Sequence, residues 1–503
     1  MRKYWIKIWL GISIVLLLNA CYTEVTYTPE MFGKTSVLAF DNHKIYFDDE
    51  CGLALCPVSD FSEYSPVIYF QEISGVSING EILSNNESFS FGPINKETIV
   101  NLQVEFASND IKDYQLKFTL LPTICIEHSN NTIPDEPKVA ALFYLSDPCL
   151  NKTIVEFCGI ERRGGSANGR PKSSFGFELN NSSELNDSKK IPLLNMDNED
   201  DWILDGLYSD LSCARNRASF DLWGAIQQDA LQQGKDVLPS TIKGQYVEVF
   251  INDRYNGVYT LSNRVDGELL GFDEDHKGYL YKCENWNQVS RFLEISDTID
   301  DAMIWAGWEQ KYPDTDEKAT WKPLYDLVDF VVNTDDKEFS EKYSSYIKID
   351  QFIDFFILVN IIKGYDNTGQ NLMLACKEFG GAFYFCPWDM DATWGRDWDS
   401  QPKNEKGIVL FEIYNRFYSI DPDNFKYKLT ARWLHLRESI VTSEILFQLF
   451  EKNIELLNIS GSADREFERW PESIPDIDQE EEYIQQWISA RLAYLDAYFS
   501  SFD

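Results

Sequence analysis

Histidine is scarce in this sequence, with four residues among 503, and no two cysteines have the C-x-x-C spacing. Both features argue against a zinc site, which needs several His or paired Cys ligands. Basic residues are also outnumbered, because 45 Lys and Arg stand against 82 Asp and Glu and give a formal charge of −37. Such a surface repels nucleic acid and anionic membranes and attracts cations or a basic partner, although solubility alone explains the acidity equally well.

A continuous apolar run of about 20 residues, the length that spans a bilayer, is absent too. The N-terminus instead has three basic residues, an apolar run from Ile8 to Leu18, and Ala20 before Cys21. This order predicts an export signal over residues 1–20. Leu18-Asn19-Ala20-Cys21 resembles a bacterial lipobox, so we expect Cys21 to carry a lipid that anchors the exported chain in the bacterial cell envelope, on the periplasmic or surface side of the outer membrane. A cleaved signal without a lipid and an N-terminal anchor helix are the alternatives.

The cysteines that follow Cys21 are odd in number, so at least one thiol stays unpaired within the chain. In an exported protein, Cys51 with Cys56 and Cys149 with Cys158 are candidates for short-loop disulfides. The sequence does not select between these disulfides and free thiols.

Short alternating apolar and polar segments, separated by Asn-Gly, Asn-Asn and Gly-Pro turns, fill residues 36–126. This pattern is typical of β-strands, and S-I-N-G-E-I over Ser77–Ile82 predicts a hairpin with a two-residue turn. We therefore expect a small β-sandwich of roughly immunoglobulin size over residues 21–127. Residues 128–137 are polar and end in proline, which predicts a linker.

The remaining residues, 138–503, predict one larger domain in which strands and helices are mixed. Its last third has apolar residues at helical spacing, over Leu429–Leu457 and again over Glu480–Phe499. Together with the sheet-rich N-terminal part, this pattern predicts an α+β fold class.

Three polar side chains near the middle of the chain, Asp366, Asn371 and Asp389, predict a catalytic site. Asp366 and Asn371 lie in a loop-like stretch, a predicted β-hairpin follows it, and Asp389 and Asp391 form an acidic turn after the hairpin. In protein kinases a catalytic-loop Asp accepts the proton of the substrate hydroxyl, and an Asn five residues later holds Mg²⁺. A further Asp binds the metal ions that bridge the phosphates. Asp366 and Asn371 have that five-residue offset, and Asp389 lies where the second metal-binding acid would fall.

The segment Arg163–Lys172 is rich in glycine and unusually basic for so acidic a chain. Backbone N–H groups at glycines can approach phosphate oxygens closely, and Arg163 and Lys172 would add positive charge. We therefore expect both residues near the phosphates of a nucleotide, with a surface hairpin turn as the alternative. The spacing matches neither a Walker A sequence nor a Rossmann fingerprint.

Other motifs overlap the acidic turn. Asp389–Thr393 matches the D-x-D-x-T of haloacid-dehalogenase-type phosphatases, but those enzymes place most of an α/β domain after the motif, and here only a mostly helical stretch follows. The D-x-D of metal-dependent glycosyltransferases is a less specific match. A turn capped by the two acids is the purely structural alternative.

Several longer motifs resemble those of the CotH family, atypical kinases first met as spore-coat proteins. R-R-G-G-S-A-N-G-R-P-K-S-S-F-G-F-E-L, over residues 162–179, is similar to the family's opening motif, and residues 202–220 look like its W-x-L…R-N segment. Residues 246–266 resemble its central hairpin, and G-Y-L-Y-K from Gly278 and P-W-D-M-D-A-T-W-G from Pro387 complete the set. These motifs cover most of the chain between residues 138 and 398.

The resemblance implies a protein-kinase-like fold that binds ATP with Mg²⁺ or Mn²⁺ and phosphorylates Ser or Thr of a protein, and the acidic surface favours a basic or Ser-rich one. Asp366 would match the catalytic base, Asn371 and Asp389 would match the metal ligands, and Asp391 would support the metal site. Lys172 would match the phosphate-pairing lysine. The alternative from another class is a surface lipoprotein whose kinase-like domain only binds a partner, but the intact acids and amide argue against it.

Two further charged residues in these motifs keep open roles. Arg215 either orients an acidic residue of the site or forms a structural pair, and Glu248 is a strand residue without an assigned partner.

Overall fold

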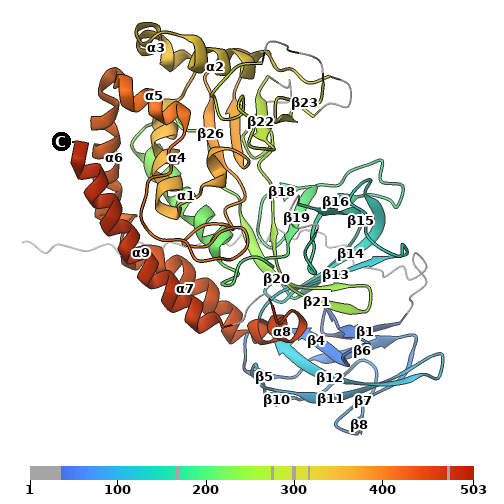
Figure 1. Cartoon of the computed structure of the whole chain (residues 1–503). Coiled ribbons are helices and arrows are strands. Elements are labelled where there is room, and N and C mark those ends of the chain that lie inside the picture. The colour runs from blue at the N-terminus through green and yellow to red at the C-terminus, as the bar shows by residue number, and fades with distance from the viewer. Residues whose placement is uncertain are drawn as a thin grey trace, which may run out of the picture.

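Figure 1 shows the computed structural model, which describes residues 36–164, 169–272, 277–296, 299, 302–314, 318–472 and 476–502. The expected export signal and Cys21 lie outside these residues, as do residues 165–168 of the Gly-rich segment. Helices and strands are both abundant, and strands dominate the N-terminal part, so the α+β fold class is confirmed. Every helix of the described part is too short or too polar to span a bilayer.

Two β-sheets near the N-terminus enclose one apolar core. The first has the strand order β2–β1–β6–β9 and the second β3–β4–β12–β11–β7–β8, while β5 and β10 form a separate pair. These strands are β1 (Val37–Phe40), β2 (His43–Lys44), β3 (Tyr46–Asp48), β4 (Leu53–Pro57), β5 (Glu63–Tyr64), β6 (Val67–Gln71), β7 (Ile73–Ile78), β8 (Glu81–Ile82), β9 (Glu87–Ser88), β10 (Gly92–Pro93), β11 (Val100–Phe106) and β12 (Ile111–Thr119). Phe40 and Ile68 of the first sheet and Leu102 and Phe118 of the second are buried in this shared core.

The predicted hairpin is confirmed, because β7 and β8 pair with Ser77 opposite Ile82. Asn79 and Gly80 have φ of 51° and 83°, and positive φ at both central residues is what a tight two-residue hairpin turn requires.

All the cysteines after Cys21 are free thiols. Neither candidate disulfide is therefore formed, and Cys51 and Cys149 are exposed whereas Cys56 and Cys158 are buried.

A closed barrel follows, with the strand order β13–β14–β15–β16–β19–β21–β20. The strands of this region are β13 (Thr123–His128), β14 (Val139–Asp147), β15 (Lys152–Arg163), β16 (Ser174–Asn180), β17 (Ile191–Pro192), β18 (Asn198–Glu199), β19 (Asp201–Asp205), β20 (Gly244–Ile251) and β21 (Arg254–Ser262). β13 pairs with both β14 and β20 and so closes the barrel. Residues 123–127, which the sequence pattern placed at the end of the first domain, therefore belong to the barrel, because two neighbouring strands satisfy their backbone hydrogen bonds.

The remainder of the chain contains a five-stranded sheet and the helices. The sheet has the order β23–β24–β22–β25–β26, formed by β22 (Tyr279–Cys283), β23 (Ile304–Trp305), β24 (Trp308–Tyr312), β25 (Leu372–Cys376) and β26 (Tyr384–Pro387). The helices are α1 (Arg215–Gln232), α2 (Lys322–Asn333), α3 (Asp336–Lys342), α4 (Ile349–Ile362), α5 (Glu412–Ile420), α6 (Phe425–Ser439), α7 (Ser443–Ile459), α8 (Ser462–Arg469) and α9 (Ile477–Phe499). In Figure 1 the long helices α7 and α9 lie side by side along one flank, and α8 reaches the barrel.

Helix α8 docks on the barrel through two buried ion pairs. Arg465 donates to both carboxylate oxygens of Glu248, at 2.8 and 2.6 Å, which gives Glu248 its partner. Burial opposes ionisation of Glu248, but the Arg465 ion pair outweighs it and lowers the pKa of Glu248. Glu466 accepts from Lys172 at 2.6 Å and from the Val258 backbone N–H at 2.7 Å. Both ends of the Lys172–Glu466 pair are almost completely buried.

Gly257 is the residue that makes room for this docking, and its substitution tests it. A Cβ there would lie 2.2 Å from Glu466 Oε2, and the backbone φ is +95°. We expect Gly257→Ala to lower the free energy of unfolding by more than about 3 kcal/mol, because it displaces one member of a buried ion pair. Gly271→Ala is the matched control, since Gly271 has φ of +64° and a Cβ there would meet no atom within 4 Å.

That control should lower the free energy of unfolding by about 1–2 kcal/mol, the cost of a left-handed backbone alone. Urea denaturation of both variants measures the difference. Equal losses in the two variants would contradict the docking argument.

Candidate active site

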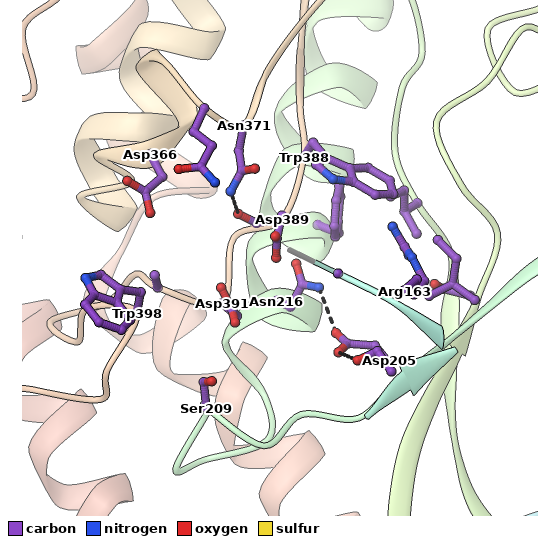
Figure 2. A pocket seen from close by; sticks show the side chains of 18 of the residues that line it. Arg163, Asp205, Ser209, Asn216, Asp366, Asn371, Trp388, Asp389, Asp391 and Trp398 are labelled. Atoms are coloured by element: carbon purple, nitrogen blue, oxygen red, sulfur yellow. Dashed lines mark hydrogen bonds between the residues drawn. The ribbon is translucent and has the colours of Figure 1, made fainter. Parts of the chain in front are cut away.

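A cavity of about 590 Å³ lies where the barrel, α1 and the five-stranded sheet meet. Cavities of this size are common for small-molecule ligands. Asp366, Asn371, Asp389 and Asp391 all line it, together with Arg163. Figure 2 shows the four polar residues around one open space, with Arg163 beyond Asp389 next to Trp388. Five of the six site residues predicted within the described part are thus brought together.

Asp366 and Asn371 are placed by the end of α4. The helix stops at Lys363, whose φ of 56° turns the chain out of the helix. A single 3-10 turn, Asp366–Thr368, follows and presents the Asp366 side chain. The Asn371 backbone N–H donates to the Asp366 carbonyl at 2.9 Å, and β25 begins at the next residue. The five-residue offset therefore corresponds to one closed loop between a helix and a strand.

Asp389 and Asp391 lie in the turn after β26. β25 and β26 pair in the predicted antiparallel hairpin, which brings this turn back beside the Asp366 loop. Asn371 Nδ2 donates to the Asp389 carbonyl at 3.3 Å, and Asn367 Nδ2 donates to the Trp388 carbonyl at 2.6 Å. Asp389 itself has φ of 51°, a backbone conformation in which Asp is among the better tolerated residues. Two amide side chains therefore join the loop to the turn.

Asp205 and Asn216 belong to the site although the sequence pattern did not identify them. Asp205 ends β19, and Asn216 lies in the first turn of α1. Asn216 Nδ2 donates to Asp205 Oδ2 at 3.2 Å, and its Oδ1 accepts from the Met390 backbone N–H at 3.1 Å. Asn216 thus connects the barrel to the acidic turn (Figure 2). The only sequence signal was their place inside the W-x-L…R-N segment.

The carboxylates around the cavity raise one another's pKa values. Burial, and then the charge of Asp205, raise the pKa of Asp389, whereas Arg163 and Lys282 act in the opposite direction. Asp389 is open to the cavity on one side, but the protein around it still removes much of its hydration. Burial, Asp389 and Asp205 raise the pKa of Asp391 well above its usual value. The site therefore holds more negative charge than its own cations balance.

Three cations line the cavity in the described chain, and one of them, Arg217, is paired with Asp221. The other two are Arg163 and Lys282. Arg163 ends β15, and its guanidinium lies 5.3 Å from the centre of the Trp388 ring. Lys282 in β22 lines the cavity and pairs with Glu284 at 2.9 Å. Lys172, the predicted phosphate-pairing residue, does not line the cavity, because its ammonium group is buried against Glu466 of α8. The expected position of Lys172 is therefore corrected: it pairs with Glu466 of α8, and Lys282 is the lysine that lines the cavity in the described chain.

Arg215 fixes the loop after the acidic turn. Its buried guanidinium pairs with Asp210 and Glu480, and its Nε donates to the Thr393 carbonyl at 3.0 Å. Asp210 and Glu480 do not line the cavity, so Arg215 has the structural role of the two, and it reaches the acidic turn through the Thr393 carbonyl.

Comparison with known proteins agrees with the order of these motifs. The model of the CotH kinase protein family matches residues 160–495, which is more than half of the chain. The chain belongs to the CotH family. The match begins in β15 of the barrel and ends within α9, so it includes every cavity-lining residue discussed above.

Among curated proteins, the inner spore coat protein H of Bacillus subtilis (strain 168) is similar to this CotH-family chain. The two are 24% identical over 195 residues, which is 39% of this chain and 50% of that protein. The chain thus matches about half of the length of that relative.

Replacement of Asp391 tests the charge balance of this CotH-type site. An acid whose pKa is raised in the folded state destabilises that state at any pH where it ionises in the unfolded chain, so at neutral pH the carboxylate is a cost. We expect Asp391→Asn to raise the free energy of unfolding by about 1 kcal/mol at pH 7 in the presence of a chelator. Thermal denaturation measures this change.

Asp399→Asn is the control, because the Asp399 carboxylate pairs with Arg170 at 3.4 Å in an exposed position, and such pairs contribute little. A loss of stability in Asp391→Asn would show that its carboxylate is supported rather than repelled.

Proposed function

We propose that this chain is a metal-dependent CotH-type protein kinase that transfers the γ-phosphate of ATP to Ser or Thr of a protein. The observation that carries the proposal is the common cavity, in which Asp366, Asn371 and Asp389 meet with Arg163 and Lys282. Phosphoryl transfer needs little covalent help from a protein and depends mainly on positioned charge. The family membership supports a kinase-like activity, and the kinase-like arrangement of the barrel and the helical part around the cavity is part of the same proposal.

The donor set suits Mg²⁺ or Mn²⁺. In the described residues no group of three or more His, Cys, Asp or Glu is arranged so that it could hold a metal ion by itself. Mg²⁺ usually takes one or two carboxylates from the protein and completes its shell with phosphate oxygens and water. Asp389 and Asp391, whose pKa values are raised by burial and by neighbouring carboxylates, together with Asn371, are the residues that would hold the ion. A bound divalent cation would supply charge neutralisation for the phosphates.

Each residue then has one task. Asp366 accepts the proton of the substrate hydroxyl, and burial, followed by the charge of Asp397, raises its pKa and so makes the carboxylate a stronger base. Arg163 lies on the cavity wall across from the Asp366 loop (Figure 2), Lys282 also lines the cavity, and both would bind phosphate oxygens. Asn216 keeps the acidic turn against Asp205, and Arg215 holds the loop that follows.

The proposal includes the location of the chain. The N-terminal signal and Cys21 support an exported lipoprotein in the bacterial cell envelope. The formal charge of −37 supports a basic protein substrate, which would approach such a surface favourably, and a Ser-rich one would offer hydroxyl groups for the transfer.

Asp366→Asn tests the chemistry. With labelled ATP and Mn²⁺, we expect phosphate transfer to fall by at least about 10²-fold, because the amide cannot accept the hydroxyl proton. ATP affinity, measured by isothermal titration calorimetry, should stay within about twofold, since Asp366 does not bind the phosphates in this scheme.

Asp399→Asn is the matched control, because Asp399 is exposed and follows Trp398, which lines the cavity. This variant should label substrate like the parent. Equal labelling by Asp366→Asn and the parent would remove Asp366 from the mechanism. A parent chain that neither binds ATP nor transfers phosphate would favour a purely binding role.

A further inference from the structure

Arg491 in α9 is a buried arginine with unusual partners. Its Nε donates to the Asn360 carbonyl at 2.7 Å, and its Nη1 donates to the carbonyls of Glu405 and Gly407 at 2.6 Å each. Its Nη2 has no hydrogen-bond partner in the described part of the chain. Arg491 is 1% exposed, and burial lowers its pKa to about 10.

A gain in folding stability does not explain a buried arginine with these partners. The hydrogen bonds of this buried charge in the described chain go to carbonyl groups, and the centre of the Tyr494 ring lies 5.7 Å from its guanidinium. A buried charge with such partners is poorly compensated, and apolar side chains of similar size often serve the packing as well. The C-terminal end of α4, which carries partial negative charge, offsets part of this penalty because Asn360 lies in the last turn of that helix. The arginine at position 491 is therefore explained by the backbone carbonyl groups that it binds, rather than by packing.

The three acceptors lie in two segments, and one of them leads directly to Asp366. The chain leaves α4 at Lys363 and reaches Asp366 three residues later. Glu405 and Gly407 belong to a loop that also receives Lys363, whose Nζ donates to the Asn404 carbonyl at 2.6 Å. Arg491 thus links the last turn of α4 to the 404–407 loop. The same loop binds Lys363, the residue at which the helix ends.

Two aromatic residues on the same face of α9 hold the region just before this loop. Trp487 and Tyr483 lie about one and two turns before Arg491. Trp487 Nε1 donates to the Lys403 carbonyl at 3.1 Å, and the Tyr483 hydroxyl donates to the Gly395 carbonyl at 2.6 Å. Both fasten the chain after the acidic turn, and Arg491 extends this row to the exit of α4.

We propose that Arg491 is a positioning residue for Asp366. It binds the Asn360 carbonyl and the 404–407 loop together, and so fixes the direction in which the chain leaves α4 and the place of the Asp366 carboxylate. The inference rests on the proposed function, in which Asp366 accepts the proton of the substrate hydroxyl. Misplacement of a catalytic group by about 1 Å can cost about 100-fold in rate, even when the altered residue is remote.

Arg491→Met tests this role in the full chain. We expect kcat for substrate labelling to fall about 10- to 100-fold. The Kd for ATP with Mn²⁺ should stay within about twofold, because Asn371, Asp389 and Arg163 are unchanged. Arg491→Lys keeps one charged donor that can reach a carbonyl, so its kcat should lie between those of Arg491→Met and the parent. If Arg491→Met does not fold, a lower kcat in Arg491→Lys than in the parent, with unchanged ATP affinity, tests the same role.

The matched control is Arg437→Met, which removes an ion pair to Asp496 that joins α6 to α9 at the surface and should leave kcat unchanged. Unchanged kcat in Arg491→Met, or parallel losses of kcat and ATP affinity, would overturn the positioning role.

Hydrogen exchange gives a readout that does not depend on activity. Arg491→Met should speed amide exchange over residues 360–371 and leave the barrel strands unchanged. If the parent neither binds ATP nor labels a substrate, the proposed function fails. Faster exchange over 360–371 then still supports the local role of Arg491, and unchanged exchange there overturns it.

Discussion

Repulsion between like charges is the constraint around which this structure is arranged. Asp205, Asp366, Asp389 and Asp391 line one cavity, and Asp205 and Asp366 both disfavour ionisation of Asp389. Carboxylates brought this close destabilise a folded chain unless something else holds them in place. Here most of the side chains that hold the carboxylates in place are neutral amides. Asn216 joins Asp205 to the acidic turn, and other amides join that turn to the Asp366 loop. Because amides are neutral, they hold the acids together without compensating the negative charge of the cavity.

Buried arginines provide the second level of support, one step further from the cavity. Arg215 holds the Thr393 carbonyl behind the acidic turn, and Arg491 holds the Asn360 carbonyl behind the Asp366 loop. Arg465 fixes α8 to the barrel through Glu248. A guanidinium suits this task because its donors diverge in a rigid plane and can bind several backbone segments at once. Asp366, Asp389 and Asp391 therefore lie on turns, and those turns are fastened by arginines from α1 and α9.

Local sequence patterns were sufficient where the chemistry depends on one short segment. Asp366, Asn371 and Asp389 were found because a loop, a hairpin and a turn keep them close along the chain. Asp205 was not found, since it reaches the site only through the closure of the barrel and the packing of α1. Lys172 was misplaced for the same reason. Its basic, Gly-rich surroundings predicted a phosphate contact, but its partner Glu466 lies 294 residues away, and no local pattern contains that information.

The charge balance also limits how a nucleotide could bind. Of the described residues that line the cavity, the acids Asp205, Glu284, Asp366, Asp389 and Asp391 outnumber the cations Arg163, Arg217 and Lys282. Screening at physiological ionic strength removes most of the long-range field beyond about 8 Å, so this local excess, rather than the net charge of the chain, governs the site. A polyphosphate alone would add negative charge to a cavity that already carries too much. Binding of ATP in the proposed function is therefore coupled to a divalent cation.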